Sequence, residues 1–266
     1  MRRDEIVAAN RAGWDEAAPR HRARNFAALE AAVRKPGFSC LDDIATLRLA
    51  EIGVAGRDVA QLCCNNGREL LSLKSMGAGR CVGFDLSPAF IDQARALARA
   101  GNIEAEFVEG DLHTLGPDRD GRFDLVLVTI GALCWFPEAG PFFAVARRLM
   151  RPGGVVFVYE QHPILDMFEP YDEGDPPPMR YSYFQTDPFI DSDGLDYYDG
   201  VKYASKPLYN FHHKMSDIVM ACIDNGLAIE HFAEYDRHLW DGFPVLARAE
   251  ARLPCAYTLI ARSEPT

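Results

Sequence analysis

The sequence predicts an α/β fold: a doubly wound, mostly parallel sheet of seven strands, with helices on both faces. Between residues 57 and 160, short apolar runs alternate with segments whose apolar residues recur at helical spacing, and this alternation is typical of a parallel sheet. The run RFDLVLVTIG at residues 122–131 is almost continuously apolar, as expected for a strand covered on both faces. A chain of 266 residues, 48% of them hydrophobic, is long enough to bury the core of one such domain.

Residues 1–55 are predicted to form an N-terminal helical cap, and residues 56–162 are predicted to form the core of the fold. Five strands are expected in this core, at residues 58–64, 80–86, 103–111, 122–131 and 155–161. The helix after the second strand has the clearest ends, with Ser87 as N-cap, Pro88 in the first turn and Gly101 at its end. The turn RPGG at residues 151–154 is expected to separate the last helix of the core from the fifth strand.

The alternation stops after the fifth strand. Residues 163–210 are rich in Pro, Asp, Gly and Tyr, and we expect them to form a substrate-binding insert, because connections longer than about 15 residues are usually functional or disordered. Within it, MRYSYF (179–184) and LDYYDG (195–200) are predicted to pair as a hairpin. Residues 211–266 are expected to return to the same domain with one helix, capped by Ser216, and the last two strands.

Composition and charge narrow the class of protein. The net charge of −11 argues against a nucleic-acid backbone or an anionic membrane as the main partner. No apolar stretch approaches the roughly 20 residues of a membrane span, and MRRDEIVAAN at the N-terminus lacks the apolar segment of a signal peptide. The seven cysteines show no zinc-binding CxxC spacing. We therefore expect a cytoplasmic protein with reduced thiols and no metal.

Candidate ligand-binding residues follow four of the predicted strands. In a doubly wound sheet, ligands bind beyond the carboxyl ends of the strands. The stretch LCCNNGREL, residues 62–70, places a turn and a helix N-terminus after the first strand, and a helix N-terminus offers backbone N–H groups to a ligand. Asp85 ends the second strand and suits the hydroxyls of a ribose, while Asp111 ends the third and suits an exocyclic amine. TIGALCW at residues 129–135 follows the fourth strand and would pass under the ligand.

With these residues in place, the sequence resembles the class I S-adenosylmethionine-dependent methyltransferases over residues of about 57–160, together with the closing helix and strands. Asp85, Asp111 and the turn before the fifth strand match the pattern of that family, and NRAGWDEAAPRHR near the N-terminus is similar to its helix over the cofactor. The resemblance implies S-adenosylmethionine as cofactor. The cofactor-binding residues that we expect are Trp14, Cys63, Asn65, Asn66, Gly67, Asp85, Leu86, Ser87, Asp111, Leu112, Thr129, Ile130 and Gly131.

The first loop departs from the family pattern. The family usually has an acidic residue followed by a Gly-x-Gly-x-Gly-like turn, whereas this chain has Gln61 and then CCNNG at residues 63–67. We expect the loop still to bind the cofactor through its backbone, because asparagine tolerates left-handed geometry better than most residues. A dinucleotide site is disfavoured because G-x-G-x-x-G is absent.

Methyl transfer from a sulfonium mainly requires alignment of donor and acceptor, and a base is needed only if the acceptor must lose a proton. His162 after the fifth strand, Glu160 beside it and His212 are the candidate catalytic residues, although each also suits an ordinary structural role. Trp135, Tyr183, Phe184 and His213 are the candidate substrate-binding residues. The aromatic side chains of the insert suit either an acceptor pocket or a contact between two copies of the chain.

Three functions remain open from the sequence. The first is methylation of a small organic molecule at oxygen, nitrogen or carbon. A nucleic-acid acceptor is disfavoured, because the charge is acidic and TIGA stands where the family's amide-nitrogen nucleic-acid methylases carry an NPPY-type motif. The second is an NAD-dependent oxidoreductase on a related sheet. The third is a relative that binds cofactor without turnover, which the altered first loop would allow.

Overall fold

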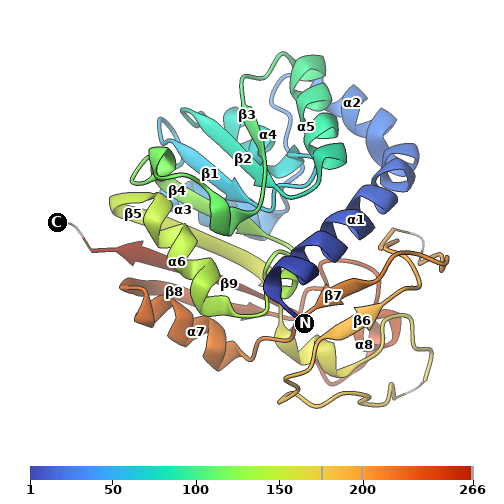
Figure 1. Ribbon diagram of the computed structural model, residues 1–266. Helices are drawn as coiled ribbons and strands as arrows, with labels where there is room; N and C mark the ends of the chain where they lie inside the picture. Colours follow the sequence, from blue (N-terminus) through green and yellow to red (C-terminus); the bar gives the residue numbers. More distant parts are fainter. Residues whose placement is uncertain (175, 199, 265–266) are drawn as a thin grey trace.

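The computed structural model of the chain describes residues 1–174, 176–198 and 200–264, and it shows the predicted layered α/β fold (Figure 1). Seven of its strands form one sheet in the order β3-β2-β1-β4-β5-β9-β8. These strands are β1 (Val59–Leu62), β2 (Cys81–Asp85), β3 (Glu106–Glu109), β4 (Phe123–Thr129), β5 (Met150–Gln161), β8 (Leu227–Tyr235) and β9 (Ala256–Ser263). The predicted fold class is therefore confirmed.

The direction of the strands places the carboxyl ends of the first five at one edge. β3, β2, β1, β4 and β5 run parallel, whereas β9 is antiparallel to both β5 and β8. The order reverses at β1, which pairs with β2 on one side and with β4 on the other. In open α/β sheets this reversal is where ligands bind.

The two faces of the sheet are covered by different helices because successive side chains of a strand point to opposite faces. Val126 and Val128 of β4 belong to the core under α6 (Ala139–Leu149) and α7 (Met215–Asp224). Leu125 and Leu127 belong to the opposite core. That core is covered by α3 (Asp43–Ile52), α4 (Arg68–Ser75) and α5 (Pro88–Gly101). The continuous apolar run of residues 122–131 is thus explained by burial on both sides.

The N-terminal helical segment lies across the carboxyl edge of the sheet (Figure 1). It comprises α1 (Arg3–His21), a π-helical turn (Arg22–Phe26) and α2 (Ala27–Val33). The side chain of Asn10 in α1 exchanges two hydrogen bonds with the backbone of Tyr209, at 2.9 and 2.7 Å. α1 therefore bridges the sheet and the insert, whereas α3 packs against a face of the sheet instead.

The insert is ordered differently from the sequence prediction. Its two-stranded sheet is formed by β6 (Phe189–Asp191) and β7 (Leu208–Asn210). The predicted hairpin was wrong: residues 179–184 form no strand, nor do the described residues of 195–200, of which position 199 lies outside the description. Instead of pairing as strands, the rings of Tyr197 and Tyr198 pack edge-on against His21 of α1, with centroids 4.7 and 5.3 Å away. These tyrosines thus attach the insert to α1.

Two local boundaries also differ from the prediction. α7 begins at Met215, with Lys214 and not Ser216 in the cap position. The RPGG segment is no separate turn but the start of the long β5, with Gly153 at a φ of +71°. The remaining short helices are η2 (Leu112–Thr114), η3 (Pro117–Arg119), η4 (Leu133–Trp135), η5 (Pro163–Met167) and α8 (Pro244–Arg248).

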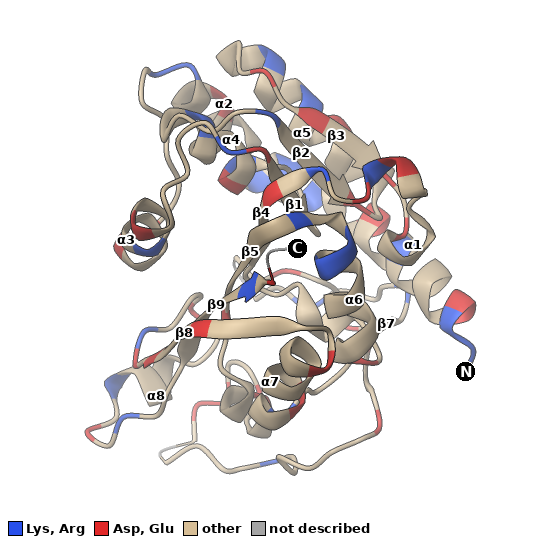
Figure 2. Cartoon of the chain, turned by 90° about the vertical axis from the view of Figure 1, so that its left-hand side faces the viewer, with Lys and Arg blue, Asp and Glu red and all other residues tan. Residues whose placement is uncertain are grey.

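Acidic and basic residues are interspersed along the helices and loops in the view of Figure 2. Several arginines are paired with carboxylates, as Arg151 is with Asp58 at 2.8 Å and with Asp124 at 2.6 Å. The basic residues form no single stripe in this view. Among the described residues, none of the helices combines the length and the apolar character that crossing a membrane requires.

Candidate cofactor and acceptor site

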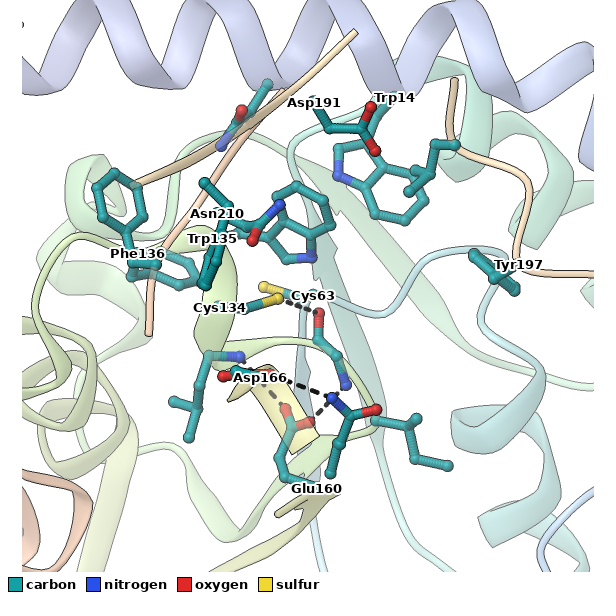
Figure 3. Close-up of a pocket in the computed structure, with 18 of the residues that line it drawn as sticks. Trp14, Cys63, Cys134, Trp135, Phe136, Glu160, Asp166, Asp191, Tyr197 and Asn210 are labelled. Atoms are coloured by element: carbon teal, nitrogen blue, oxygen red, sulfur yellow. Dashed lines mark hydrogen bonds between the residues drawn. The ribbon is translucent and has the colours of Figure 1, made fainter. Parts of the chain in front are cut away.

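A cavity of about 1240 Å³ lies beyond the carboxyl ends of β1, β2, β4 and β5. α1 covers it, and the insert and the loop after β4 form its other walls (Figure 3). Ligand sites of about 300–1000 Å³ hold one small molecule. This cavity is therefore large enough for a nucleotide-sized cofactor together with an acceptor.

The loop between β1 and α4 keeps the backbone of a glycine loop although it has only one glycine. Cys63, Asn65 and Gly67 all have positive φ, at +54°, +49° and +73°. Every second residue is thus left-handed, in the spacing of a Gly-x-Gly-x-Gly turn. Non-glycine residues in this region are uncommon, and such strain is concentrated at functional sites. The loop therefore supports the cofactor-turn interpretation through its geometry.

Neighbouring residues explain why this variant of the loop folds. Cys64 is fully buried and packs where Gly83 of β2 leaves room: a Cβ at position 83 would lie 2.7 Å from the Cys64 sulfur. The side-chain oxygen of Asn65 accepts from the backbone N–H of Asn66 at 2.8 Å. At Gly67, a Cβ would lie 2.4 Å from the ring of Phe107. Position 67 is thus the one place in the loop where both φ and packing require glycine.

Asp85 lies at the end of β2 and lines the cavity. Its carboxylate accepts from the backbone N–H groups of Asn65 at 2.7 Å and Ser87 at 2.9 Å. Burial nevertheless raises the pKa of Asp85 to about 6. An ionised carboxylate has about four lone-pair directions, so these contacts leave room for a hydroxyl of a ligand. Ser87 itself does not line the cavity: its hydroxyl caps α5 and contacts Asp15 of α1.

The end of β3 is held by α1. Arg3 pairs with Asp111, which lines the cavity, and Arg11 pairs with Glu109. The other oxygen of Asp111 accepts from the backbone N–H of His113 at 3.0 Å. A ligand amine that binds Asp111 would therefore share this carboxylate with Arg3. The helix thus contributes a charged contact directly beside the predicted adenine site.

The loop after β4 is fixed from below by Glu160 of β5. This buried carboxylate accepts from the backbone N–H groups of Gly131, Ala132 (2.7 Å) and Leu133 (3.2 Å). Burial raises its pKa, and the three N–H groups act in the opposite direction. Dashed bonds to Glu160 can be followed in Figure 3. Its contacts are those of a residue that positions the loop.

The floor of the cavity has two buried polar atoms without a partner among the described residues. The side-chain nitrogen of Gln61 donates to Thr129 at 2.9 Å, which leaves its oxygen unpaired. The hydroxyl of Tyr257 in β9 is fully buried and also unpaired. Both residues line the cavity. Because buried polar groups are normally hydrogen-bonded, these atoms indicate that a polar ligand completes the site.

The predicted catalytic histidines lie behind the cavity wall. His162 donates to Glu234 at 2.9 Å and accepts from the backbone N–H of Ile164 at 3.1 Å, so both of its nitrogens are used. His212 donates to Asp166 at 2.9 Å. Neither histidine lines the cavity, whereas Asp166 does. The sequence-based prediction did not include Asp166, because no spacing pattern distinguishes this residue from the other acidic residues of the insert.

Of the predicted substrate-binding residues, Trp135 and His213 line the cavity and the other two do not. The hydroxyl of Tyr183 accepts from the backbone N–H of Met215 at 2.9 Å, and Phe184 is 75% exposed. His213 donates to the carbonyl of Phe136 at 2.9 Å. The predicted cofactor residues that line the cavity are Trp14, Cys63, Asn65, Asp85, Leu86, Asp111, Leu112, Thr129, Ile130 and Gly131.

Cysteine thiols also line the cavity. Cys63 and Cys134 line it, and burial raises the pKa of both thiols well above their usual range. Among the described residues, no group of three His, Cys, Asp or Glu side chains is arranged to hold a metal ion.

Parts of the chain are similar to known methyltransferases. Residues 59–154 match a family model described as a methyltransferase domain. A malonyl-[acyl-carrier protein] O-methyltransferase of Hahella chejuensis is 32% identical over 99 residues, which are 37% of this chain and 34% of that protein. The chain thus matches about a third of the length of this curated relative.

Two solved structures share the fold. An S-adenosylmethionine-dependent methyltransferase from Mesorhizobium loti superimposes with a TM-score of 0.56 and 22% identity, covering 82% of this chain and 96% of that one. The magnesium protoporphyrin IX methyltransferase of Synechocystis PCC 6803, solved with bound S-adenosylmethionine, has a TM-score of 0.56 and 16% identity, covering 97% of both chains. Residues 59–154 therefore match a methyltransferase domain, and the two solved structures share the fold of the chain.

Proposed function

We propose that the protein transfers a methyl group from S-adenosylmethionine to a small organic acceptor, at oxygen, nitrogen or carbon. The observation that carries this proposal is the cavity at the reversal of strand order, where the left-handed loop of residues 63–67 and Asp85 lie together. The matching methyltransferase domain supports it.

The residues of the cavity suit this cofactor. Asp85 has lone pairs left for the ribose hydroxyls, and Asp111 suits the adenine amine. The unpaired oxygen of Gln61 and the backbone of residues 63–65 would face the amino-acid end. When bound, S-adenosylmethionine supplies a methyl group that is already activated by its sulfonium.

The protein's own contribution is alignment and exclusion of water. Trp14 of α1 packs edge-on against Trp135, with ring centroids 5.1 Å apart, so that α1 and the loop after β4 close over the cavity together. Holding two reactants in place in this way can contribute about 7–11 kcal/mol to catalysis. α1 is thus a part of the reaction site.

A proton acceptor, where the substrate requires one, is best supplied by Asp166. Its carboxylate lines the cavity and is bonded to His212 on one oxygen and to Gln161 on the other, at 2.9 and 3.2 Å. We expect no such role for His162, because both of its ring nitrogens are already hydrogen-bonded. Glu160 would act through the loop that it positions.

A turnover assay tests the proposal. The protein is incubated with S-adenosylmethionine and a panel of small alcohols, amines, thiols and carbon acids, and the S-adenosylhomocysteine formed is measured together with the mass of the product. We expect a gain of one methyl group on at least one acceptor and loss of this activity in Asp85→Ala. Reduction of NAD by a substrate, without methyl transfer, would favour the oxidoreductase; cofactor binding without turnover on any acceptor would favour a non-catalytic relative.

A further inference from the structure

The acceptor side of the cavity is strongly acidic. Within the described part of the insert, five carboxylates and one ammonium group line the cavity. The carboxylates are those of Asp166, Glu169, Asp191, Asp193 and Asp196, and the ammonium group is that of Lys202. The insert therefore gives the acceptor side an excess of negative charge.

Pairing within the protein neutralises only part of this charge. Lys202 pairs with Asp193 at 2.9 Å, and both side chains are largely exposed. Asp191 accepts from the backbone N–H of Asp193 at 2.7 Å. In the described ranges, neither Asp166 nor Asp191 has an arginine or lysine within ion-pair distance; Asp166 has only His212. Two carboxylates at the cavity thus lack a permanent cation.

Each of the two arginines among the described residues that line the cavity has a carboxylate partner. Arg3 pairs with Asp111, and Arg68 pairs with Glu69 at 2.7 Å. Neither is therefore free to receive an anionic acceptor. A carboxylate or phosphate entering on the side of the insert would meet Asp166 and Asp191, and the ammonium group of Lys202 on that side is already paired with Asp193.

The remaining walls suit an organic cation. Trp14, Trp135, Phe136 and Tyr197 line the cavity, and Figure 3 shows these rings around it together with Asp166 and Asp191. Aromatic faces attract ammonium groups by about 0.5–2 kcal/mol each. Independently of the charges, Tyr257 lines the cavity, and its buried hydroxyl has no hydrogen-bond partner among the described residues.

We propose that the acceptor is a small organic amine whose ammonium group is recognised by the carboxylates of the insert and whose apolar part packs against the aromatic walls. This substrate class rests on the proposed methyltransferase function. The ammonium group is the feature that the cavity recognises, and the methylated atom can be another atom of the same molecule.

Three probes of nearly equal size test the charge preference: 2-phenylethylamine, 2-phenylethanol and phenylacetate. Each is titrated calorimetrically into the full-length protein, with and without saturating S-adenosylhomocysteine, whose own binding is measured first. We expect the amine to bind at least tenfold more tightly than the alcohol, equivalent to ~1.4 kcal/mol, and the anion to bind most weakly. The affinity of the amine, and not of the alcohol, should fall as salt screens the carboxylates.

Matched variants locate the effect. Asp191→Asn and Asp166→Asn keep a side-chain acceptor but remove the charge. Each should weaken the binding of the amine about fivefold or more and leave the affinity for the alcohol unchanged. Asp187→Asn is the control, because Asp187 lies in the same insert but is exposed and does not line the cavity; it should change neither. The melting temperature of each variant checks that it is folded.

The outcomes separate this inference from the function on which it rests. If S-adenosylhomocysteine binds but the alcohol or phenylacetate binds as tightly as the amine, or no probe binds, the amine proposal is overturned and the methyltransferase proposal stands. If the amine preference and its loss in Asp191→Asn are found while S-adenosylhomocysteine does not bind, the charge recognition stands and the proposed function fails.

Discussion

Replacing Glu160 by glutamine tests whether this residue holds the loop after β4 in place. The carboxylate is 4% exposed and accepts three backbone hydrogen bonds, one on one oxygen and two on the other. Glutamine has nearly the same shape but only one oxygen. Its NH₂ group would therefore face either the N–H of Gly131 or those of Ala132 and Leu133, a donor against a donor.

The structure allows the size of the effect to be worked out. A hydrogen bond to a charged group contributes about 1.5–3 kcal/mol, and a buried N–H left unpaired costs a further ~1–3 kcal/mol. Removing a buried charge recovers part of this loss. We expect Glu160→Gln to lower the free energy of unfolding by about 2 kcal/mol, which corresponds to a melting temperature about 4–8 °C lower in a chain of this size.

Urea denaturation at pH 7.5 measures this difference, and Glu104→Gln provides the control because Glu104 is exposed and carries the same charge. The affinity for S-adenosylhomocysteine should also fall in Glu160→Gln, since Gly131 and Leu133 line the cavity. A Glu160→Gln variant within about 0.5 kcal/mol of the control, the usual range of surface substitutions, would refute the account of the loop.

Three further predictions concern the cofactor side. Gly67→Ala should destabilise the protein by about 2–3 kcal/mol in urea denaturation, because its Cβ would lie 2.4 Å from Phe107; a neutral change would contradict the packing. Cys63→Gly should be about 1 kcal/mol more stable than Cys63→Ala, since glycine relieves the φ of +54°; the reverse order would exclude strain. With the pKa of Asp85 at about 6, S-adenosylhomocysteine should bind about tenfold more weakly at pH 5 than at pH 8. In Asp85→Asn, the affinity measured by calorimetry should not change between these two pH values.

The direction of this pH dependence follows from the ionisation state of Asp85 that binds the ligand. Burial raises the pKa of Asp85 above its ordinary value of 3.8, so the free carboxyl is mostly protonated at pH 5 and mostly ionised at pH 8. Ribose hydroxyls donate hydrogen bonds to the ionised form. For the folded protein alone, the raised pKa means that the contribution of Asp85 to stability decreases as the pH rises from about 4 to 6.

The fold could be predicted because its signals are local. Both faces of β4 are covered, which makes its sequence continuously apolar, and the carboxylates of Asp85 and Asp111 stand directly at strand ends. The insert lacks such signals. Its strands β6 and β7 are three residues each and are separated by a long loop, so their pairing depends on contacts with α1 that no local pattern records.

The candidate site was predictable on the cofactor side and less so on the acceptor side. The loop of residues 63–67 has an unusual composition, yet its spacing still indicated a turn, and its positive φ values explain how Cys63 and Asn65 replace glycines. His162 suggested a base by its position after β5. The side chain instead meets Glu234 of β8, a neighbour far away in the sequence. The position of Asp166 at the cavity likewise depends on contacts that the insert makes with distant parts of the chain.

The most direct measurement is a calorimetric titration of the wild-type protein and of Asp85→Ala with S-adenosylmethionine, S-adenosylhomocysteine and NAD, each separately. The account predicts micromolar binding of both adenosyl compounds to the wild type, loss of that binding in Asp85→Ala, and no binding of NAD. Binding of NAD, or adenosyl affinities unchanged in Asp85→Ala, would contradict the assignment of this cavity as the S-adenosylmethionine site.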